Sequence, residues 1–172
     1  MPTKFATIEG NGKVRRVSLT NTLDAPIRIV WEAITQLEHM VHWWPDWQPG
    51  GIIEPKEGGR IKLEDGSWID GVIKTWSPPH ILEFTWNNNS KQDMPWFEPA
   101  TCSQLRIDLV DLSSAQTRLN LIQFLPEQST VGGTAGWHHF AGERLSQYLN
   151  HGEISEDPGR FQAIKLLYEK DL

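Results

Sequence analysis

The chain is poor in cysteine and has no long apolar run. Cys102 is its one cysteine among 172 residues, which excludes an intrachain disulfide and a cysteine-rich zinc site. No apolar run approaches the roughly 18 residues of a membrane span, so we expect no transmembrane helix. Residues 1–11 lack the apolar core of a signal peptide. These features together predict a cytoplasmic protein.

Positive charge is also scarce. The chain has 16 Lys and Arg against 22 Asp and Glu, a net charge of −6, and Arg15-Arg16 is its densest basic pair. Binding to a phosphate backbone requires a basic surface, so we expect no nucleic-acid partner. A basic amphipathic helix for a membrane surface is missing too, and we expect no membrane insertion.

Tryptophan is the residue that the chain has in excess, with nine among 172 residues. The indole is large, rigid and polar at one edge, so it suits both a buried core and the wall of a small-molecule pocket. Its frequency alone does not distinguish these two uses. The rest of the composition, 38% hydrophobic and 22% charged, is typical of a globular domain.

The first half of the chain predicts short strands and two short helices. Gly10-Asn11-Gly12 lies between two extended runs and predicts a hairpin. Asp24, followed by Pro26, predicts a capped helix start, and a second short helix is expected over residues 37–43. From residue 47 to 124 the alternating pattern and the turn residues predict a meander of strands.

The second half predicts helices. A long amphipathic helix is expected over residues 134–150, and a tail helix over 158–170 with Asp157 as its cap. The glycines at 132–136 are interpreted as a flexible gate beside the long helix. The order predicts an α+β fold in which a curved antiparallel sheet wraps around the long C-terminal helix, with a cavity between them. We expect one domain over residues 1–152 and a tail over 153–172, packed on that domain or on a dimer mate.

Four stretches then resemble a known family, the activator of heat-shock-protein-ninety ATPase homologue-like proteins of the START-like (SRPBCC, helix-grip) superfamily. The match runs from about residue 19 to 152. The order of its pieces is more specific than any one of them. They are TLDAP at 22–26 leading into VWEAI at 30–34; WW at 43–44 with GGRI at 58–61; DG at 65–66, GVI at 71–73, PP at 78–79 and LEFTW at 82–86; and TRLNL at 117–121 with the segment 136–149.

This resemblance implies a helix-grip fold with two short helices after the first strand and a cavity between the sheet and the long helix. Members of the superfamily bind lipids, steroids, flavonoids and polyketides, and some relatives are cyclases. The family shares no invariant catalytic set that transfers to this chain. The eukaryotic activators add a separate chaperone-binding domain, for which 172 residues leave no room, so the family name is not taken as the function.

The candidate binding residues are mostly aromatic. We expect Trp43, Trp44 and Trp96 to rim the mouth of the cavity, and Trp68, Trp86 and Trp137 to line its interior, with Leu145 on the apolar stripe of the long helix. Gln123 interrupts an apolar strand and is expected to face inward. Because a buried amide needs hydrogen-bond partners, a ligand, water or the backbone would have to supply them.

The candidate acid–base groups are Asp70 and His138. The sequence does not decide which face of its strand Asp70 occupies. It either faces the cavity or forms a salt bridge on the solvent side. His138 is either a cavity-edge group or part of a surface pair with His139, near Glu143. His39 and His42 lie three residues apart on a predicted helix, but Pro45 breaks that helix before Asp46, so no third ligand is placed. We therefore interpret the histidines as surface residues and expect no metal and no cofactor.

Three functions remain open at this point. The leading one is binding of a small hydrophobic or aromatic molecule in the cavity, without catalysis, by a monomer or homodimer. The second is a cyclase- or hydrolase-like enzyme that uses Asp70 or His138 in the same cavity. The third is a chaperone-associated interaction protein that docks through its tail helix.

Overall fold

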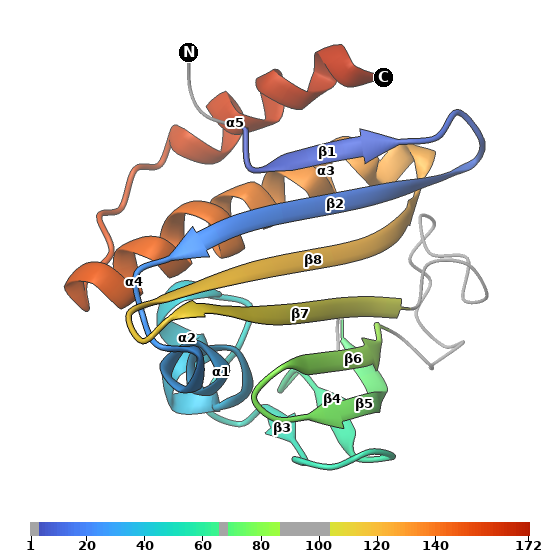
Figure 1. Cartoon of the computed structure of the whole chain (residues 1–172). Coiled ribbons are helices and arrows are strands. Elements are labelled where there is room, and N and C mark those ends of the chain that lie inside the picture. The colour runs from blue at the N-terminus through green and yellow to red at the C-terminus, as the bar shows by residue number, and fades with distance from the viewer. Residues whose placement is uncertain (1–3, 66–68, 87–103) are drawn as a thin grey trace.

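A computed structural model describes residues 4–65, 69–86 and 104–172 of the chain (Figure 1). Its sheet has eight antiparallel strands in the order β1-β2-β8-β7-β6-β5-β4-β3. The outer strands β3 and β4 are short. The strands are β1 (Ala6–Glu9), β2 (Val14–Leu23), β3 (Ile52–Ile53), β4 (Arg60–Lys62), β5 (Asp70–Ser77), β6 (Ile81–Thr85), β7 (Gln104–Ser113) and β8 (Gln116–Pro126).

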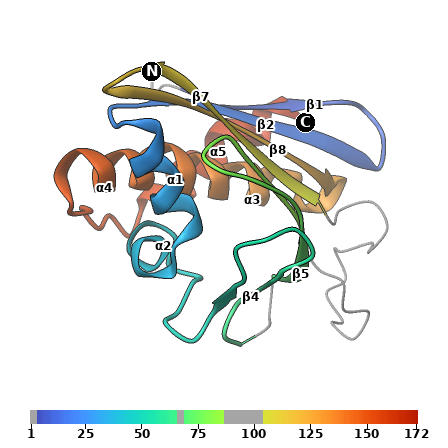
Figure 2. The same ribbon diagram turned by 60° about the horizontal axis from the view of Figure 1, so that its bottom comes forward.

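The helices fall into two groups. Two short ones, α1 (Ile27–Thr35) and α2 (Leu37–Trp43), follow β2. After β8 comes one continuous long helix, made of α3 (Glu127–Trp137), the π-helical segment η1 (His138–Arg144) and α4 (Leu145–His151). Figure 2 shows α3 and α4 along one face of the sheet, with α1 and α2 beside them. This arrangement confirms the predicted α+β fold.

The tail forms α5 (Arg160–Tyr168) and the short helix η2 (Glu169–Asp171). α5 lies beside α3 and close to β1 (Figure 1). Its buried side chains are Ile164 and Tyr168. The Tyr168 hydroxyl accepts a hydrogen bond from the backbone N–H of Ala6 at 3.3 Å, so the tail helix is tied to the first strand.

The core lies between the sheet and the long helix, and the period of two along β8 shows how it is built. Thr117, Leu119, Leu121, Gln123 and Leu125 are all buried and alternate with more exposed residues. Successive side chains of a strand point to opposite faces, so these five share the face that the long helix covers. Gln123 therefore faces inward, as its place in the strand predicts.

Some local predictions are confirmed and one helix start is wrong. The hairpin at residues 10–12 joins β1 to β2, and α2 has the predicted bounds of 37–43. Asp24, however, does not cap α1. The N-cap is Pro26, without a side-chain cap hydrogen bond, and the Asp24 Oδ1 instead accepts from Gln116 Nε2 at 2.9 Å. The Asp24 carboxylate therefore binds a distant side chain, Gln116, instead of capping the helix that follows it.

The expected glycine gate before the long helix is also wrong. Gly132, Gly133 and Gly136 lie inside α3, which begins at Glu127 rather than at Thr134. Glycine costs about 1 kcal/mol relative to alanine in a helix interior, which is why the pattern suggested a break. Packing explains the exception at Gly133, because a Cβ there would overlap the Leu125 side chain of β8. The close approach of helix and sheet offsets the poor helix propensity.

No helix in the described ranges 4–65, 69–86 and 104–172 is both long enough and apolar enough to cross a membrane.

Candidate functional site

An apolar pocket of about 670 Å³ opens between the end of the sheet and the first turns of the long helix. β8 and α3 form its walls, and the segment after α2, the end of β6 and the start of α5 complete it. The described residues that line it are Trp44, Asp46, Trp86, Gln123, Leu125, Gln128, Ser129, Gly132, Gly133, Gly136, Trp137, Phe140 and Phe161.

At Gly132 and Gly136 the long helix contributes no side chain to the pocket. Gly132 and Gly136 are four residues apart, so they lie one above the other on the same side of α3. A Cβ built at Gly132 would meet nothing within 4 Å, and one at Gly136 would reach only Phe140 Cε2 at 4.0 Å. The space beside these two positions is the pocket itself. The missing side chains at these two positions therefore leave room for the pocket.

Three tryptophans form the aromatic wall. The ring of Trp44 lies 5.0 Å from that of Trp137 at 70°, and 6.1 Å from that of Trp86 at 23°. Trp86 and Trp137 are 5.9 Å apart at 73°. These edge-to-face and stacked geometries are the favoured arrangements for aromatic pairs. The three rings come from different elements, so the fold itself assembles the wall.

The three indole N–H groups of this wall have different partners. Trp137 Nε1 donates to Gln123 Oε1 at 2.7 Å, and Trp44 Nε1 donates to Asp46 Oδ2 at 3.1 Å. Trp86 Nε1 is buried and has no hydrogen-bond partner among the described residues. The same holds for Gln123 Nε2, on a side chain only 2% exposed. Both nitrogens are enclosed by protein atoms, and neither has an acceptor among the described residues.

The tail helix contributes Phe161 to the pocket. Its neighbour Arg160 forms a bidentate ion pair with Glu143 of η1, donating through Nε to Oε2 at 2.9 Å. Glu143 also pairs with His138 Nε2 at 3.1 Å, a contact between residues five apart in the π-helical segment. The sequence does not identify Phe161 as a pocket residue, because nothing in the local pattern of α5 indicates that its first turn lies at the pocket.

The buried groups around Glu143 have shifted pKa values. Burial lowers the pKa of His138, although the nearby Glu143 carboxylate opposes this. The pKa of His139 is lowered for the same reason. Burial alone would raise the pKa of Glu143, but the hydrogen bonds and charge of Arg160 outweigh it and the pKa is lowered. His138 Nδ1 is also 2.6 Å from the Tyr168 hydroxyl, so a neutral imidazole joins the long helix to the tail.

This arrangement predicts a loss of stability in mild acid. The unfolded chain takes up a proton at His138 as the pH falls through about 6.5, whereas the folded chain resists it. The free energy of unfolding is therefore expected to fall between about pH 7.5 and pH 5. Below the ordinary pKa of 4.5, the lowered pKa of Glu143 adds a further loss. Urea unfolding at a series of pH values measures this dependence.

His138→Asn removes one of the two shifted imidazoles and is expected to reduce the fall in stability between pH 7.5 and pH 5, with His139 supplying the remainder. The same replacement at His151, which is exposed at the end of α4, controls for the loss of an imidazole. A wild-type stability that is constant or rises as the pH falls through this window would contradict the assignment.

The structure brings together four of the ten residues proposed from sequence. Trp44, Trp86, Gln123 and Trp137 line the pocket. Trp68 and Trp96 lie outside the described residues. The remaining four, Trp43, Asp70, His138 and Leu145, are placed elsewhere in the fold and are not among the residues that line the pocket.

The expected position of Trp43 at the pocket mouth is wrong. Trp43 is 1% exposed and its indole donates to the Ala33 carbonyl of α1 at 2.8 Å, so it joins the two short helices. Leu145 is fully buried in the core under the sheet. His138 is fully buried too, and its ring contacts lie with Phe5 and Tyr168 rather than with the tryptophans of the pocket.

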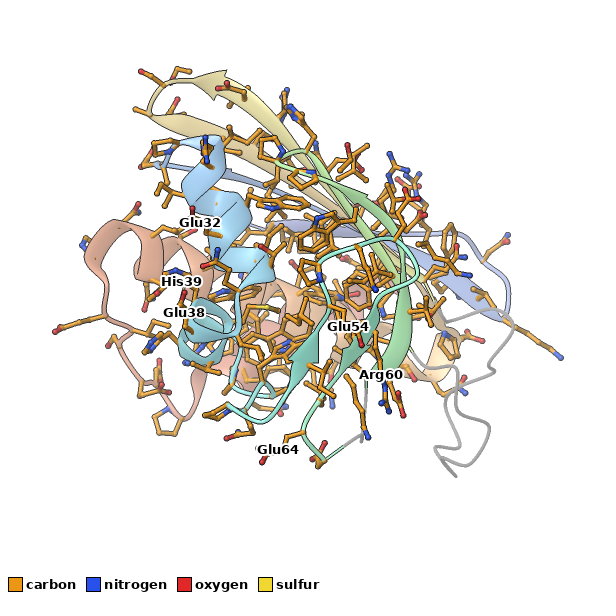
Figure 3. All side chains as sticks on the ribbon, turned by 90° about the horizontal axis from the view of Figure 1, so that it is seen from below. Glu32, Glu38, His39, Glu54, Arg60 and Glu64 are labelled. Carbon is orange, nitrogen blue, oxygen red and sulfur yellow. The ribbon has the colours of Figure 1, made fainter. Side chains whose placement is uncertain are left out.

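Asp70 lies on the outer side of its strand. Gly71 and Ile73 are the buried residues of β5, so Asp70 is on the opposite face. Its carboxylate is 3.9 Å from the guanidinium of Arg60, the first residue of β4. Figure 3 labels Arg60. This is the solvent-side alternative that the sequence had left open.

The histidines of α2 contact one tyrosine. His39 Nδ1 is 2.7 Å from the Tyr148 hydroxyl, and the ring of His42 stacks on Tyr148 at 5.4 Å. Figure 3 shows His39 beside Glu38, away from Glu54 and the β3–β4 end. Within the described ranges, no group of three or more His, Cys, Asp and Glu side chains is arranged to hold a metal ion.

The sequence matches one known protein family. The family described as "Activator of Hsp90 ATPase homolog 1-like protein" matches residues 24–150. Comparison with the curated proteins returned no match.

Several solved structures share the fold. EF2215 from Enterococcus faecalis, a conserved protein of unknown function, has a TM-score of 0.72 at 17% identity, covering 96% of this chain and 88% of its own. CalU16 from Micromonospora echinospora has a TM-score of 0.70 at 21% identity, covering 96% and 97%. PFC0360w, an HSP90 activator from Plasmodium falciparum, has a TM-score of 0.59 at 16% identity, covering 82% and 99%. At these identities the likeness establishes the fold alone.

Proposed function

The chain belongs to the Activator of Hsp90 ATPase homolog 1-like family, and we propose that it binds a small aromatic molecule in the pocket between β8 and α3. The observation that carries the proposal is the pairing of an aromatic wall with a bare helix face. Trp44, Trp86 and Trp137 supply the aromatic surface, and Gly132 and Gly136, on the same helix as Trp137, supply a stretch of wall without side chains. A flat, apolar ligand fits a space bounded in this way.

The energetics favour an aromatic occupant. Each well-oriented aromatic pair contributes about 0.5–1.5 kcal/mol beyond the burial of its surface. Small-molecule sites in proteins are concave, mostly apolar and about 300–1,000 Å³ in volume, with a few placed polar groups. The pocket, at about 670 Å³, lies within that range. Few of the described residues that line it are polar, so we expect apolar contacts to supply most of the affinity for a ligand.

The two alternative functions have less support. The enzyme alternative depended on Asp70 or His138, and neither is among the described residues that line the pocket. The docking alternative depended on an exposed apolar stripe along the tail helix. Ile164 and Tyr168 of that stripe are instead buried within this chain, at 1% and 0% exposure.

Equilibrium dialysis with fluorene tests the proposal. Fluorene is a flat, neutral hydrocarbon with no hydrogen-bonding group, so it reports on the apolar pocket alone. We expect one molecule bound per chain, with a dissociation constant on the order of 10 µM for a ligand of this size. Failure to bind fluorene near its solubility limit would contradict the proposed function.

A further inference from the structure

A second pocket, of about 400 Å³, lies between the short helices α1 and α2 and the strands β3 and β5. No described residue lines both this pocket and the one between β8 and α3, so the two are separate. Two walls of the second pocket are the indole rings of Trp31, on α1, and Trp76, on β5. The ring centroids are 5.1 Å apart and the planes meet at 67°, so the two rings form a corner.

An irregularity in β5 turns Trp76 toward this corner. Ile73 pairs with Phe84 and Trp76 pairs with Leu82, so β5 has one more residue than β6 over this stretch, and the register shifts between Ile73 and Thr75. Paired residues lie on the same face of a sheet, and Leu82 and Phe84 are both buried. Trp76 therefore faces inward, whereas strict alternation from Ile73 would turn it outward. Bulges of this kind re-aim a side chain and are frequent next to functional sites.

The charge of the second pocket is negative. Glu38 is the one charged side chain among the described residues that line it. It is exposed in the first turn of α2, so its carboxylate is available to a ligand. Figure 3 shows Glu38 and Glu32 on the helix side of this region and Glu54 on the strand side. Glu54 itself lies between Ile53 and Pro55, which both line the pocket.

The described part of the chain supplies no cation of its own to the two rings. Lys4 Nζ lies 5.4 Å from the ring centroid of Tyr168, and this is the one such contact among the described residues. The face of an aromatic ring carries the negative end of its quadrupole, and indole attracts a cation most strongly of the aromatic side chains. Trp31 and Trp76 thus offer the surface that a cation prefers, beside a carboxylate that would balance its charge.

We infer that the second pocket binds a quaternary ammonium group such as that of choline. Its methyl groups lie against Trp31 and Trp76, and Glu38 balances its charge. Aromatic walls with a nearby carboxylate suit this group, because it is cationic yet has no N–H to hydrogen-bond. A phosphate on the same ligand would face Glu38 without any described cation in the lining, so the ligand is a free cation and not a phosphocholine headgroup.

A matched pair of probes tests the charge requirement. Choline and 3,3-dimethyl-1-butanol have the same shape and differ by a positively charged nitrogen in place of a carbon atom. An NMR titration of the indole N–H signals follows Trp31 and Trp76 directly. We expect saturable shifts with choline, with a dissociation constant on the order of 1 mM, and binding of the neutral alcohol at least about tenfold weaker. The signals of Trp44 and Trp137, in the other pocket, are expected to stay unmoved.

Two variants assign the site to its residues. Glu38→Gln is expected to weaken choline binding about threefold, as for an exposed ion pair, and to leave the binding of the alcohol unchanged. The control is Glu169→Gln, the same change at an exposed residue of η2 near the opposite end of the molecule (Figure 1), which is expected to change neither. Trp76→Leu keeps an apolar side chain but removes the aromatic face, and is expected to weaken choline binding at least about tenfold.

Thermal unfolding confirms that the variants are folded, and Glu38→Gln keeps the test intact if Trp76→Leu is not. Equal binding of choline and the neutral alcohol would overturn the inference, as would unmoved Trp31 and Trp76 signals up to about 50 mM choline. Equal weakening by Glu38→Gln and Glu169→Gln would mean that only the net charge of the protein acts. Tighter binding of glycerophosphocholine than of choline would overturn the choice of a free cation. None of these outcomes bears on fluorene binding, so the proposed function stands or fails separately.

Discussion

Fluorene binding is expected to weaken by at least about 30-fold in the double variant Gly132→Leu, Gly136→Leu. Both positions lie on the pocket side of α3, and a Cβ there meets nothing closer than 4.0 Å. Two leucine side chains would occupy the space that the ligand needs, next to the tryptophan wall. A 30-fold change corresponds to about 2 kcal/mol of lost binding free energy.

The same variant is expected to be at least as stable as the wild type. Glycine is about 1 kcal/mol less favourable than alanine or leucine in a helix interior, so two replacements favour α3 by up to about 2 kcal/mol. The new side chains also meet an apolar wall. Loss of binding together with retained stability separates a filled pocket from a damaged fold. Urea unfolding and fluorene dialysis on the same protein measure the two quantities.

The matched control is the pair Gly132→Ala, Gly136→Ala. It has the same gain in helix propensity but adds only two methyl groups, so fluorene affinity is expected to stay within about threefold of the wild type. Equal binding by the wild type, the alanine pair and the leucine pair would mean that the probe binds elsewhere.

Removal of residues 157–172 is expected to cost about 3–6 kcal/mol of unfolding free energy. The deletion exposes the surfaces that Ile164 and Tyr168 cover, and burial of a large apolar side chain contributes about 1.5–3 kcal/mol. It also leaves Glu143 without Arg160 and His138 without the Tyr168 hydroxyl. Urea unfolding of the shortened chain measures the loss.

A point variant keeps this prediction testable if the shortened chain does not fold. Tyr168→Ala removes the most buried side chain of α5 and is expected to cost at least about 2 kcal/mol. Leu166→Ala, at a side chain 51% exposed on the same helix, is the control and is expected to change stability by less than about 0.5 kcal/mol. Unchanged stability after loss of the whole tail would instead favour the docking alternative.

Local sequence features predicted those parts of the fold in which local chemistry decides the structure. The glycine-rich turn at 10–12 specifies its own hairpin, and Pro45 together with the apolar spacing specifies the end of α2. The inward direction of Gln123 follows from strand alternation alone. In these cases no distant residue competes with the local preference.

Prediction failed where tertiary packing overrides local preference. The glycines predict a helix start at Thr134, seven residues after the observed start of α3 at Glu127. The packing of Leu125 against Gly133, which explains the difference, is not visible in the local sequence. The spacing of Gly132 and Gly136 by four residues indicates two missing side chains on one face of a helix, but only once the helix is known to include them. Phe161 belongs to the site through a contact between distant segments, which no local pattern records.

The most direct test of the central claim is an NMR titration of the tryptophan indole N–H signals with fluorene. The chain contains its own control, because Trp31 and Trp76 line a separate pocket of about 400 Å³ beside α1. We predict saturable shifts at Trp44, Trp86 and Trp137, with the signals of Trp31 and Trp76 unmoved. Saturable shifts at Trp31 and Trp76 instead, or no shift at Trp137 up to the solubility limit of the probe, would contradict the placement of the binding site between β8 and α3.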